Sequence, residues 1–172
     1  PLLDITQNTV LTTLKCSGNS ISSLDLTQNI ALIFLDCEFN QLSTLDLSQN
    51  TVLICVNLRN NQLTSLDVRN GNNLNFYTYF GFSSPFNTLY NPNLTCINID
   101  DSTYSTNNWT NIDPQSYFSN NCIIYGCTDS SAINYYAGAN VDDGSCIYAG
   151  CSGNLTFNSD VSSESIYNGF GV

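Results

Sequence analysis

The side chains of this sequence that could carry out chemistry are cysteines and carboxylates. Its 172 residues include 8 Cys and 14 Asp or Glu, but only 3 Lys or Arg and no His, which gives a formal net charge of -11. Without histidine, neither a Ser-His-Asp triad nor a His-ligated zinc site can be built. A chain this acidic does not neutralise phosphate groups, so nucleic-acid binding is excluded.

Two pairs of carboxylates are candidates for the chemistry of a glycosidase. They are Asp36 with Glu38 and Asp100 with Asp101. Side chains two residues apart on one face of a strand lie about 7 Å apart, which suits paired-carboxylate hydrolysis. Nothing in the sequence indicates that the pKa of either pair is raised, however, as a general acid requires. We therefore expect a protein that is not an enzyme and has no catalytic residues.

The sequence contains an internal repeat. Leu3, Leu24, Leu45 and Leu66 recur at a strict interval of 21 residues, and such periods are typical of stacked structural repeats. Three consecutive coils share the pattern LxxLx(C/L)xxNx(L/I). Its positions are Leu11, Leu14, Cys16, Asn19 and Ile21; Leu32, Leu35, Cys37, Asn40 and Leu42; and Leu53, Val56, Leu58, Asn61 and Leu63.

This pattern resembles the leucine-rich repeat family, in a form similar to the surface-protein repeats of Bacteroidetes-type bacteria. The resemblance implies a repeat solenoid with short parallel β-strands on its concave face. Each coil buries its apolar edge only against its neighbours. We expect returns made of tight turns or polyproline-like segments and mostly free of helix. The last strand of the concave sheet is expected at 94–99, in a shortened fifth coil.

Polar residues repeat in register with the leucines. Stacked Asn side chains can bond to backbone groups of the turns in their own and adjacent coils; these are Asn19, Asn40 and Asn61. A carboxylate recurs on the return side, at Asp4, Asp25, Asp46 and Asp67. We favour a structural ladder for these carboxylates; the alternative is a row that binds cations.

A solenoid needs a cap over its last coil, and the segment 94–122 looks like the capping element of this repeat family. Its apolar lid would come from Trp109, Ile112, Tyr117 and Phe118. The resemblance implies a Cys96–Cys122 disulfide that pins this lid. The first domain is therefore predicted to span 1–122.

The segment 123–148 is predicted to be a small separate module. Residues 125–148 closely resemble a short GCTD…NY…DDGSC-type repeat of secreted and cell-surface proteins. Cys127 and Cys146 bracket it and are expected to pair, because so small a unit needs a staple. Five of its residues carry side-chain oxygens of the kind that calcium prefers; the alternative is that they form turns and caps. These residues are Asp129, Asn134, Asn140, Asp142 and Asp143. Residues 149–172 are predicted to be a linker or the start of a further module.

The candidate binding residues lie on the predicted concave face. Phe34, Cys55, Phe76 and the neighbouring Phe80 would form an exposed apolar column, and exposed aromatic patches often mark contact surfaces. The polar candidates are Asp36, Glu38, Asn57 and Arg59, of which Glu38 and Arg59 could also simply pair. The aromatic insertion Tyr77–Phe86 is either a binding loop or a bulky local core.

The remaining cysteines fall into two kinds. Cys16 and Cys37 occupy the inward strand position that Leu58 occupies in the third coil, so we expect both cysteines to be reduced core residues. Cys55 faces the concave side without an obvious mate, and Cys151 belongs to an incomplete second copy of the small module.

These features predict a non-catalytic recognition or adhesion module, secreted or on the outer cell surface, that binds a protein or a glycan. The cysteines favour an oxidising compartment, and no apolar stretch is long enough for membrane insertion. A passive spacer in a surface filament is the alternative. The resemblance also implies that the chain is part of a larger protein handled by type IX-like export machinery.

Overall fold

The structure is a computed structural model that describes residues 2–78, 81–123, 125–136 and 139–148. The predicted site residue Phe80, Cys151 and the segment 149–172 lie outside these residues. The chain divides into two compact units, residues 1–123 and residues 124–172, and each is described by itself. Within the described ranges, no helix is long and apolar enough to cross a membrane.

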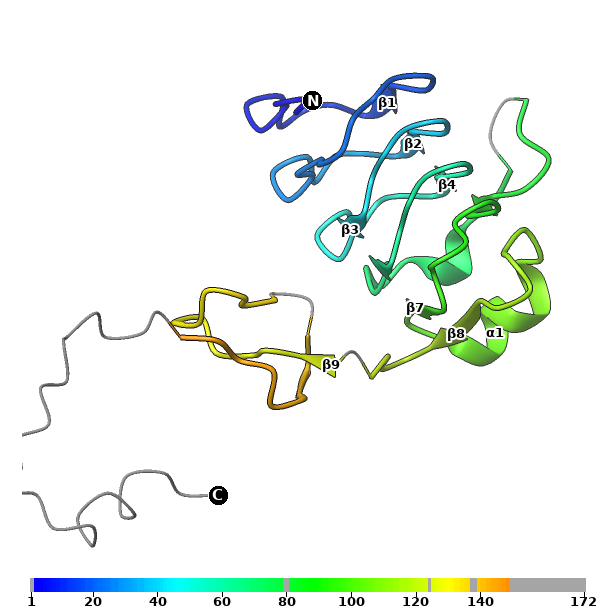
Figure 1. Cartoon of the computed structure of the whole chain (residues 1–172). Helices are drawn as coiled ribbons and strands as arrows, with labels where there is room; N and C mark the ends of the chain where they lie inside the picture. Colours follow the sequence, from blue (N-terminus) through cyan, green and yellow to red (C-terminus); the bar gives the residue numbers. More distant parts are fainter. Residues whose placement is uncertain (1, 79–80, 124, 137–138, 149–172) are drawn as a thin grey trace, which may run out of the picture. The chain divides into compact units, whose positions relative to one another are not determined.

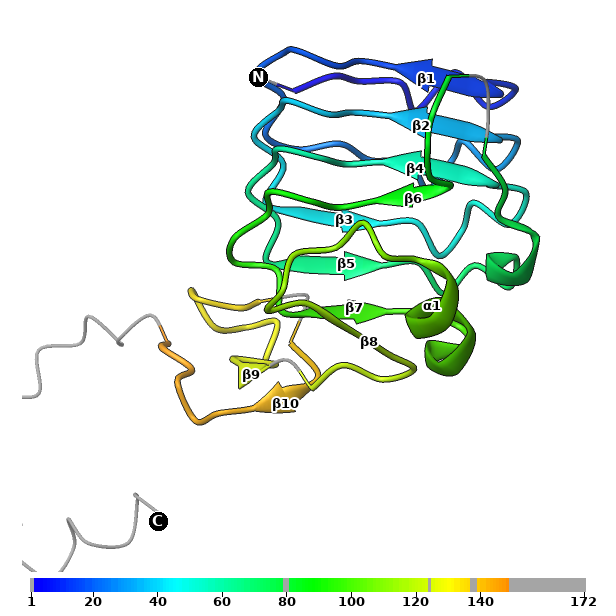
Figure 2. The same cartoon turned by 90° about the vertical axis from the view of Figure 1, so that its right-hand side faces the viewer.

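The first unit winds in successive coils whose strands stack into two four-stranded parallel sheets (Figures 1 and 2). The first sheet contains β1 (Thr13–Lys15), β2 (Phe34–Asp36), β4 (Cys55–Asn57) and β6 (Phe86–Asn87), in that order. Its register places Leu14, Leu35, Val56 and Phe86 side by side. The steps are 21, 21 and 30 residues, so the fourth coil is nine residues longer than the repeat. Phe86 therefore takes the inward position beside Val56, while Tyr77, which lies 21 residues after Val56 in the sequence, is exposed.

The returns form a second sheet, where we expected turns or polyproline-like segments. It contains β3 (Thr44–Asp46), β5 (Ser65–Asp67), β7 (Cys96–Asn98) and β8 (Tyr117–Ser119). The assignment of 94–99 to the first sheet was wrong, because β7 pairs with β5 and β8. The long fourth coil supplies the first-sheet strand at Phe86 instead. Helical structure among the described residues is confined to a 3-10 turn (Asn73–Asn75) and α1 (Ser102–Asn108).

The core is built from the inward residues of both sheets. Leu14 and Val56 of the first sheet belong to the same apolar cluster as Leu45 and Leu66 of the second. Each such side chain, once fully buried, contributes about 1.5–3 kcal/mol. The short strands are thus held by stacking and burial rather than by their length.

The far end of the stack from β1 is closed by α1 and β8 (Figures 1 and 2). Trp109 is buried there and stacks on Phe86, with ring centroids 4.6 Å apart. Phe76 and Phe118 contact the same indole at 4.9 and 5.8 Å. Tyr117, expected in the lid, is exposed. The Cys96–Cys122 disulfide is present and joins β7 to the segment that follows β8.

The asparagine ladder is confirmed and has one more rung than expected. The Asn61 amide donates to the Cys37 and Leu58 carbonyls at 3.0 and 3.1 Å, while its oxygen accepts from the Leu42 N–H at 3.0 Å. Asn40 makes the equivalent three bonds, and so does Asn91. Each of these side chains therefore ties its own coil to the preceding one.

Candidate functional site

The predicted apolar column on the first sheet is not exposed. Phe34 and Cys55 are completely buried and Phe76 is 6% exposed, so their assignment to a contact surface was wrong. The reason is the insertion in the fourth coil, which crosses the outer face of the first sheet (Figure 2). Phe82 from this segment packs against Phe34, with ring centroids 5.1 Å apart. The insertion thus acts as a local core.

The polar candidates Asp36 and Asn57 are also largely buried. They lie side by side on β2 and β4, and the Asn57 amide donates to the Asp36 carboxylate at 3.0 Å. With exposed fractions of 8% and 3%, they offer little surface to a partner. In this structure the two side chains are hydrogen-bonded to each other across the sheet.

Arg59 and Glu38 remain half-buried at the end of this sheet and do not pair. Among the described residues the one ion pair is Arg69–Asp67. The Arg59 guanidinium instead lies over Tyr90, with Cζ 4.8 Å from the ring centroid. Its Nε is buried and has no hydrogen-bond partner within the described chain.

The first-sheet strands lead into turns that repeat one backbone conformation. Gly18, Phe39, Asn60 and Tyr90 each precede an asparagine of the ladder and have φ of 71°, 53°, 53° and 64°. Glycine and asparagine adopt this left-handed region most readily, while for other L residues it is higher in conformational free energy. Phe39 and Tyr90 nevertheless occupy it, and their side chains are 52% and 55% exposed.

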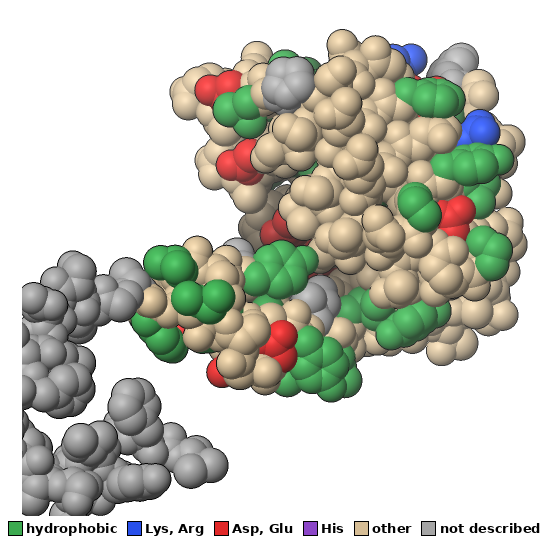
Figure 3. All heavy atoms as spheres, viewed as in Figure 1, with side chains coloured by type: hydrophobic (Ala, Val, Ile, Leu, Met, Phe, Trp, Pro, Cys, Tyr) green, Lys and Arg blue, Asp and Glu red, His purple; other side chains and the backbone are tan. Residues whose placement is uncertain are grey.

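We call Phe39, Arg59, Asn60 and Tyr90 the turn edge. Of these residues, Arg59 was predicted from the sequence and the two aromatic residues were not. The available signal was an aromatic residue directly before a ladder asparagine, as in Phe39-Asn40 and Tyr90-Asn91. Hydrophobic and basic side chains are visible on the side of the unit where β1, β2 and β4 lie (Figure 3).

The return-side carboxylates of unit 1 are occupied by local turns. Asp4 and Asp25 accept hydrogen bonds from the backbone and hydroxyl of Thr6 and Thr27. These bonds lower the pKa of both carboxyl groups. Asp46 and Asp67 accept from the backbone two residues ahead in the same way. The structural interpretation of this row is therefore supported.

The second carboxylate pair proposed for hydrolysis is used in the same manner. Asp100 accepts from the Gly71 N–H at 2.8 Å, and Asp101 caps α1 by accepting from the Tyr104 N–H at 2.9 Å. Together with the bond between Asp36 and Asn57, these contacts give three of the four candidate carboxylates a role in the fold.

The second unit pairs β9 (Tyr125–Gly126) with β10 (Val141–Asp142) and contains the Cys127–Cys146 disulfide. Asn134 links its two halves, donating to the Ser145 carbonyl and accepting from the Ile147 N–H, both at 2.7 Å. A Cβ atom at Gly126 would lie 3.1 Å from the Tyr136 ring, so a larger residue here would require that ring to shift by a few tenths of an ångström.

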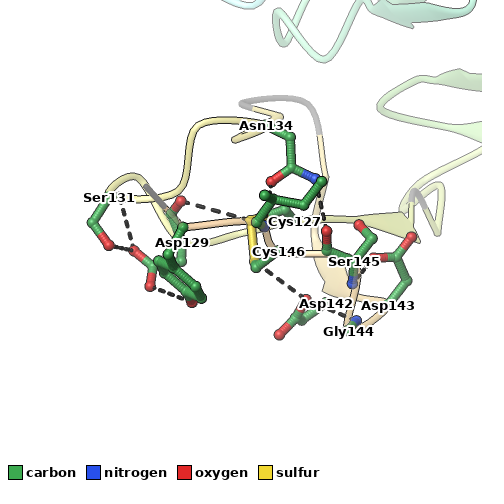
Figure 4. Close-up of a disulfide and its surroundings, with 11 residues drawn as sticks. Cys127, Asp129, Ser131, Asn134, Asp142, Asp143, Gly144, Ser145 and Cys146 are labelled. Atoms are coloured by element: carbon green, nitrogen blue, oxygen red, sulfur yellow. Dashed lines mark hydrogen bonds between the residues drawn. A yellow bond between two sulfur atoms is a disulfide. The ribbon is translucent and has the colours of Figure 1, made fainter. Parts of the chain in front are cut away.

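The predicted calcium ligands of this unit do not converge. Asp129 lies on one side of the disulfide, and Asp142 and Asp143 lie on the other (Figure 4). Asp129 accepts from the Ser131 backbone and hydroxyl at 2.8 and 2.7 Å. Asp142 and Asp143 accept from the backbone two residues ahead, and Asn140 is exposed.

The positions of these side chains fit a role in turn formation better than the joint coordination of one calcium ion. Within the described residues, no three His, Cys, Asp or Glu side chains are grouped so that they could hold a metal ion. The hydrogen bonds from Ser131 and Ser145 lower the pKa of Asp129 and Asp143 respectively. Calcium binding by this unit stays a prediction of the sequence.

Comparison with known proteins gives one distant similarity. No family model matches the sequence, and no curated protein matches it. Among solved structures, the functional domain of InlJ from Listeria monocytogenes, which includes a cysteine ladder, is 34% identical with a TM-score of 0.41. The match covers 56% of this chain and 22% of that one, so this chain spans less than a quarter of its length.

Proposed function

We propose that this protein is a non-catalytic recognition module of the leucine-rich-repeat solenoid type, secreted or displayed at the cell surface. In this proposal the turn edge of the first unit binds a protein partner. The observation that carries it is the pair of aromatic residues, Phe39 and Tyr90, held in a left-handed backbone conformation with about half of each side chain exposed.

The left-handed backbone conformation of Phe39 and Tyr90 costs conformational free energy, which supports a role for these residues other than stabilising the fold. A left-handed conformation costs an L residue other than glycine roughly 1–2 kcal/mol. Gly18 and Asn60 show that less costly residues fit the same turn. About half of each aromatic residue nevertheless remains exposed to solvent, which is apolar surface that the fold itself leaves uncovered. Aromatic residues and arginine are, however, the side chains that dominate the binding energy of protein interfaces.

Charge indicates the chemistry of the partner. Of the three basic residues, Arg69 is paired with Asp67 at the second sheet, whereas Lys15 and Arg59 belong to the first-sheet side. Guanidinium groups bind carboxylates through two parallel hydrogen bonds, and Arg59 has no carboxylate partner among the described residues. The partner we propose is a protein segment with Asp or Glu beside an apolar side chain.

The disulfides support the location outside the cytoplasm. Cys96–Cys122 and Cys127–Cys146 are both formed, and such bonds persist mainly in oxidising compartments. Membership of a larger surface protein and export by a type IX-like route remain predictions from the sequence.

The test is to apply the labelled protein to a synthetic peptide array and to a glycan array. We expect binding to acidic peptides with a neighbouring apolar residue, and loss of that binding in Tyr90→Asn and Arg59→Gln. Tyr117→Asn is the matched control, because Tyr117 is 56% exposed but lies on β8 of the second sheet. Binding to glycans alone, or equal loss in the control, would contradict the proposal. Binding to neither array would favour the passive spacer.

A further inference from the structure

The first coil leaves one end of the apolar core open among the described residues. Leu14 and Ile21 are 9% and 7% exposed, whereas their counterparts in the second coil, Leu35 and Leu42, are completely buried. Together with Leu3, the two first-coil residues line a hollow of about 700 Å³. β1 is the outermost strand of its sheet (Figure 2). The hollow is therefore the uncovered end of the core.

The backbone at this end also lacks a partner strand. Each later coil offers carbonyls to the coil before it: the Asp36 carbonyl accepts from the Cys16 N–H at 2.8 Å, and the Asn57 carbonyl accepts from the Cys37 N–H at 2.9 Å. Lys15 is the register partner of Asp36, so by the same pattern its carbonyl faces the open edge. An unpaired strand edge of this kind is a template for pairing with another chain.

Asn19 is the one rung of the asparagine ladder whose bonds between coils are not made. The next rung, Asn40, donates to the Cys16 carbonyl and accepts from the Ile21 N–H of the preceding coil, both at 3.0 Å. Asn19 donates only to carbonyls of its own coil, and its oxygen accepts no hydrogen bond from the described residues. This end of the stack therefore has the donors and acceptors for one more strand with the same turn.

A segment of the chain outside the described residues matches the sequence of a coil. Residues 151–154 read Cys-Ser-Gly-Asn, identical to residues 16–19, in which the glycine has the left-handed backbone and the asparagine belongs to the ladder. Nine residues after its cysteine, each stretch continues with an aspartate, an apolar residue and a hydroxyl residue. These triplets are 25–27 in the coil and 160–162 in the C-terminal segment.

This C-terminal stretch, which was expected to begin a second small module, fits the coil better. In the small module Asp129 follows the first cysteine by two residues, whereas Gly153 takes that place here. The match to the coil is incomplete, because Thr156 and Ser159 stand where the coils have Ile or Leu. Both are inward positions, so the segment suits an added strand and turn held mainly by backbone bonds.

We infer that residues 149–162 of one copy dock as an added strand on the first coil of a second copy. The Cys151 N–H then donates to the Lys15 carbonyl, while Asn19 donates to the Cys151 carbonyl and accepts from the Thr156 N–H. The two copies use different surfaces, so repeated docking generates a ring or a filament. The first-coil end does not include the turn edge, and the inference stands independently of the proposed partner.

A second copy is a better source of this strand than the same chain. Two joints of five residues connect Cys122 to Cys151 on either side of the Cys127–Cys146 disulfide. Fully extended, they span at most about 36 Å, and the disulfide adds a Cα separation of 4.7 Å. The added strand lies six strand spacings from β8, or about 29 Å along the stack, and the route must pass round the outside of the coils. Docking on the same chain would therefore need both joints almost straight.

The test is sedimentation velocity of the full chain over a range of concentrations, at moderate salt because each copy carries a net charge of -11. We expect the average mass to rise with concentration above that of a monomer. Gly153→Val should stay monomeric, because a β-branched residue is strongly disfavoured in the left-handed turn. Gly169→Val is the matched control and should associate normally, since it lies in the same segment beyond the match. A parent chain that stays monomeric, or equal association in Gly153→Val, would overturn the inference.

Two further measurements separate docking from other contacts. Cys151→Leu should still associate, because Leu58 occupies the equivalent position in the third coil; loss of association would point to a disulfide between copies and contradict docking. The Gln41 N–H donates to the Ile21 carbonyl of the preceding coil, so the amide of its counterpart Ser20 should gain protection from hydrogen exchange as concentration rises. Protection of Ser20 in a monomer would place the segment on its own chain and contradict the second copy.

Discussion

The Arg59 guanidinium lies over the Tyr90 ring, with Cζ 4.8 Å from the ring centroid. The two residues come from successive coils, of which the second contains the long insertion. Asn91 nevertheless donates to the Leu58 carbonyl in the same way that Asn40 and Asn61 donate to carbonyls of their preceding coils. The extra residues therefore leave the turn undisturbed, and Tyr90 remains in one column with Phe39.

Replacing Phe39 by asparagine tests how much folding free energy is lost by holding an aromatic residue in the left-handed conformation of this turn. Asparagine occupies the same turn at Asn60 and adopts the left-handed region more readily than phenylalanine. We expect Phe39→Asn to leave the free energy of unfolding unchanged or to raise it by up to about 1 kcal/mol, as measured by urea denaturation. The reverse change, Asn60→Phe, should lower it. Marked destabilisation by Phe39→Asn would show that the ring serves the fold.

The asparagine ladder predicts a graded loss of stability. Asn61→Ala leaves buried backbone groups of two coils without partners, at about 1–3 kcal/mol for each group. Asn19 is exposed and bonds only to carbonyls of its own coil, so Asn19→Ala should cost much less. Chemical denaturation of the two variants gives the comparison. Equal effects would mean that the inter-coil bonds contribute little.

The disulfides are expected to act on separate units. Cys96–Cys122 closes a sequence separation of 26 residues, for which the chain-entropy estimate is about 3–4 kcal/mol. Cys122→Ser should therefore lower the melting temperature of the first unit, as followed by Trp109 fluorescence. Cys127→Ser should leave that transition where it is. A shift of the tryptophan signal in Cys127→Ser would contradict this independence.

The second unit should lose stability at both extremes of pH. Hydrogen bonds from Ser131 and Tyr148 lower the pKa of Asp129 below its usual 3.8, so its contribution is present above that pH and is lost on acidification. The same Asp129–Tyr148 bond raises the pKa of the phenol above 10.0, so this contribution is present below pH 10.0 and is lost as pH rises. NMR titration of the two groups measures both shifts. In Asp129→Asn the tyrosine pKa should return toward its usual value; a Tyr148 pKa that does not move would exclude the pairing.

Much of the first unit could be predicted from the sequence because its strands repeat at a fixed interval. The period that aligns Leu3 with Leu24 also places Leu14 beside Leu35, as the register shows. The period fails where the fourth coil lengthens, because it would place Tyr77 beside Val56, whereas the structure places Phe86 there. The second sheet was missed because strands of three residues such as Thr44–Asp46 carry too little alternation to be distinguished from an extended return.

The candidate site was less predictable because exposure depends on what covers a face. The period correctly places Phe34 on the outer side of the first sheet, but the covering by Phe82 comes from an insertion outside the repeat. The turn edge was missed for a different reason. A positive φ at Phe39 or Tyr90 is a property of the shared turn, and only Gly18 and Asn60 in the same column indicate it in the sequence.

The most direct test of the turn edge is an NMR titration of the isotopically labelled protein with an acidic peptide that binds on the array. Backbone resonances of residues 38–41, 59–61 and 89–91 should shift, while those of 44–46 and 65–67 on the second sheet should not. The Phe39→Asn/Tyr90→Asn double variant should show no shifts at the same peptide concentration and keep its folded spectrum. Shifts confined to the second sheet, or undiminished binding by the double variant, would contradict recognition through the turn edge.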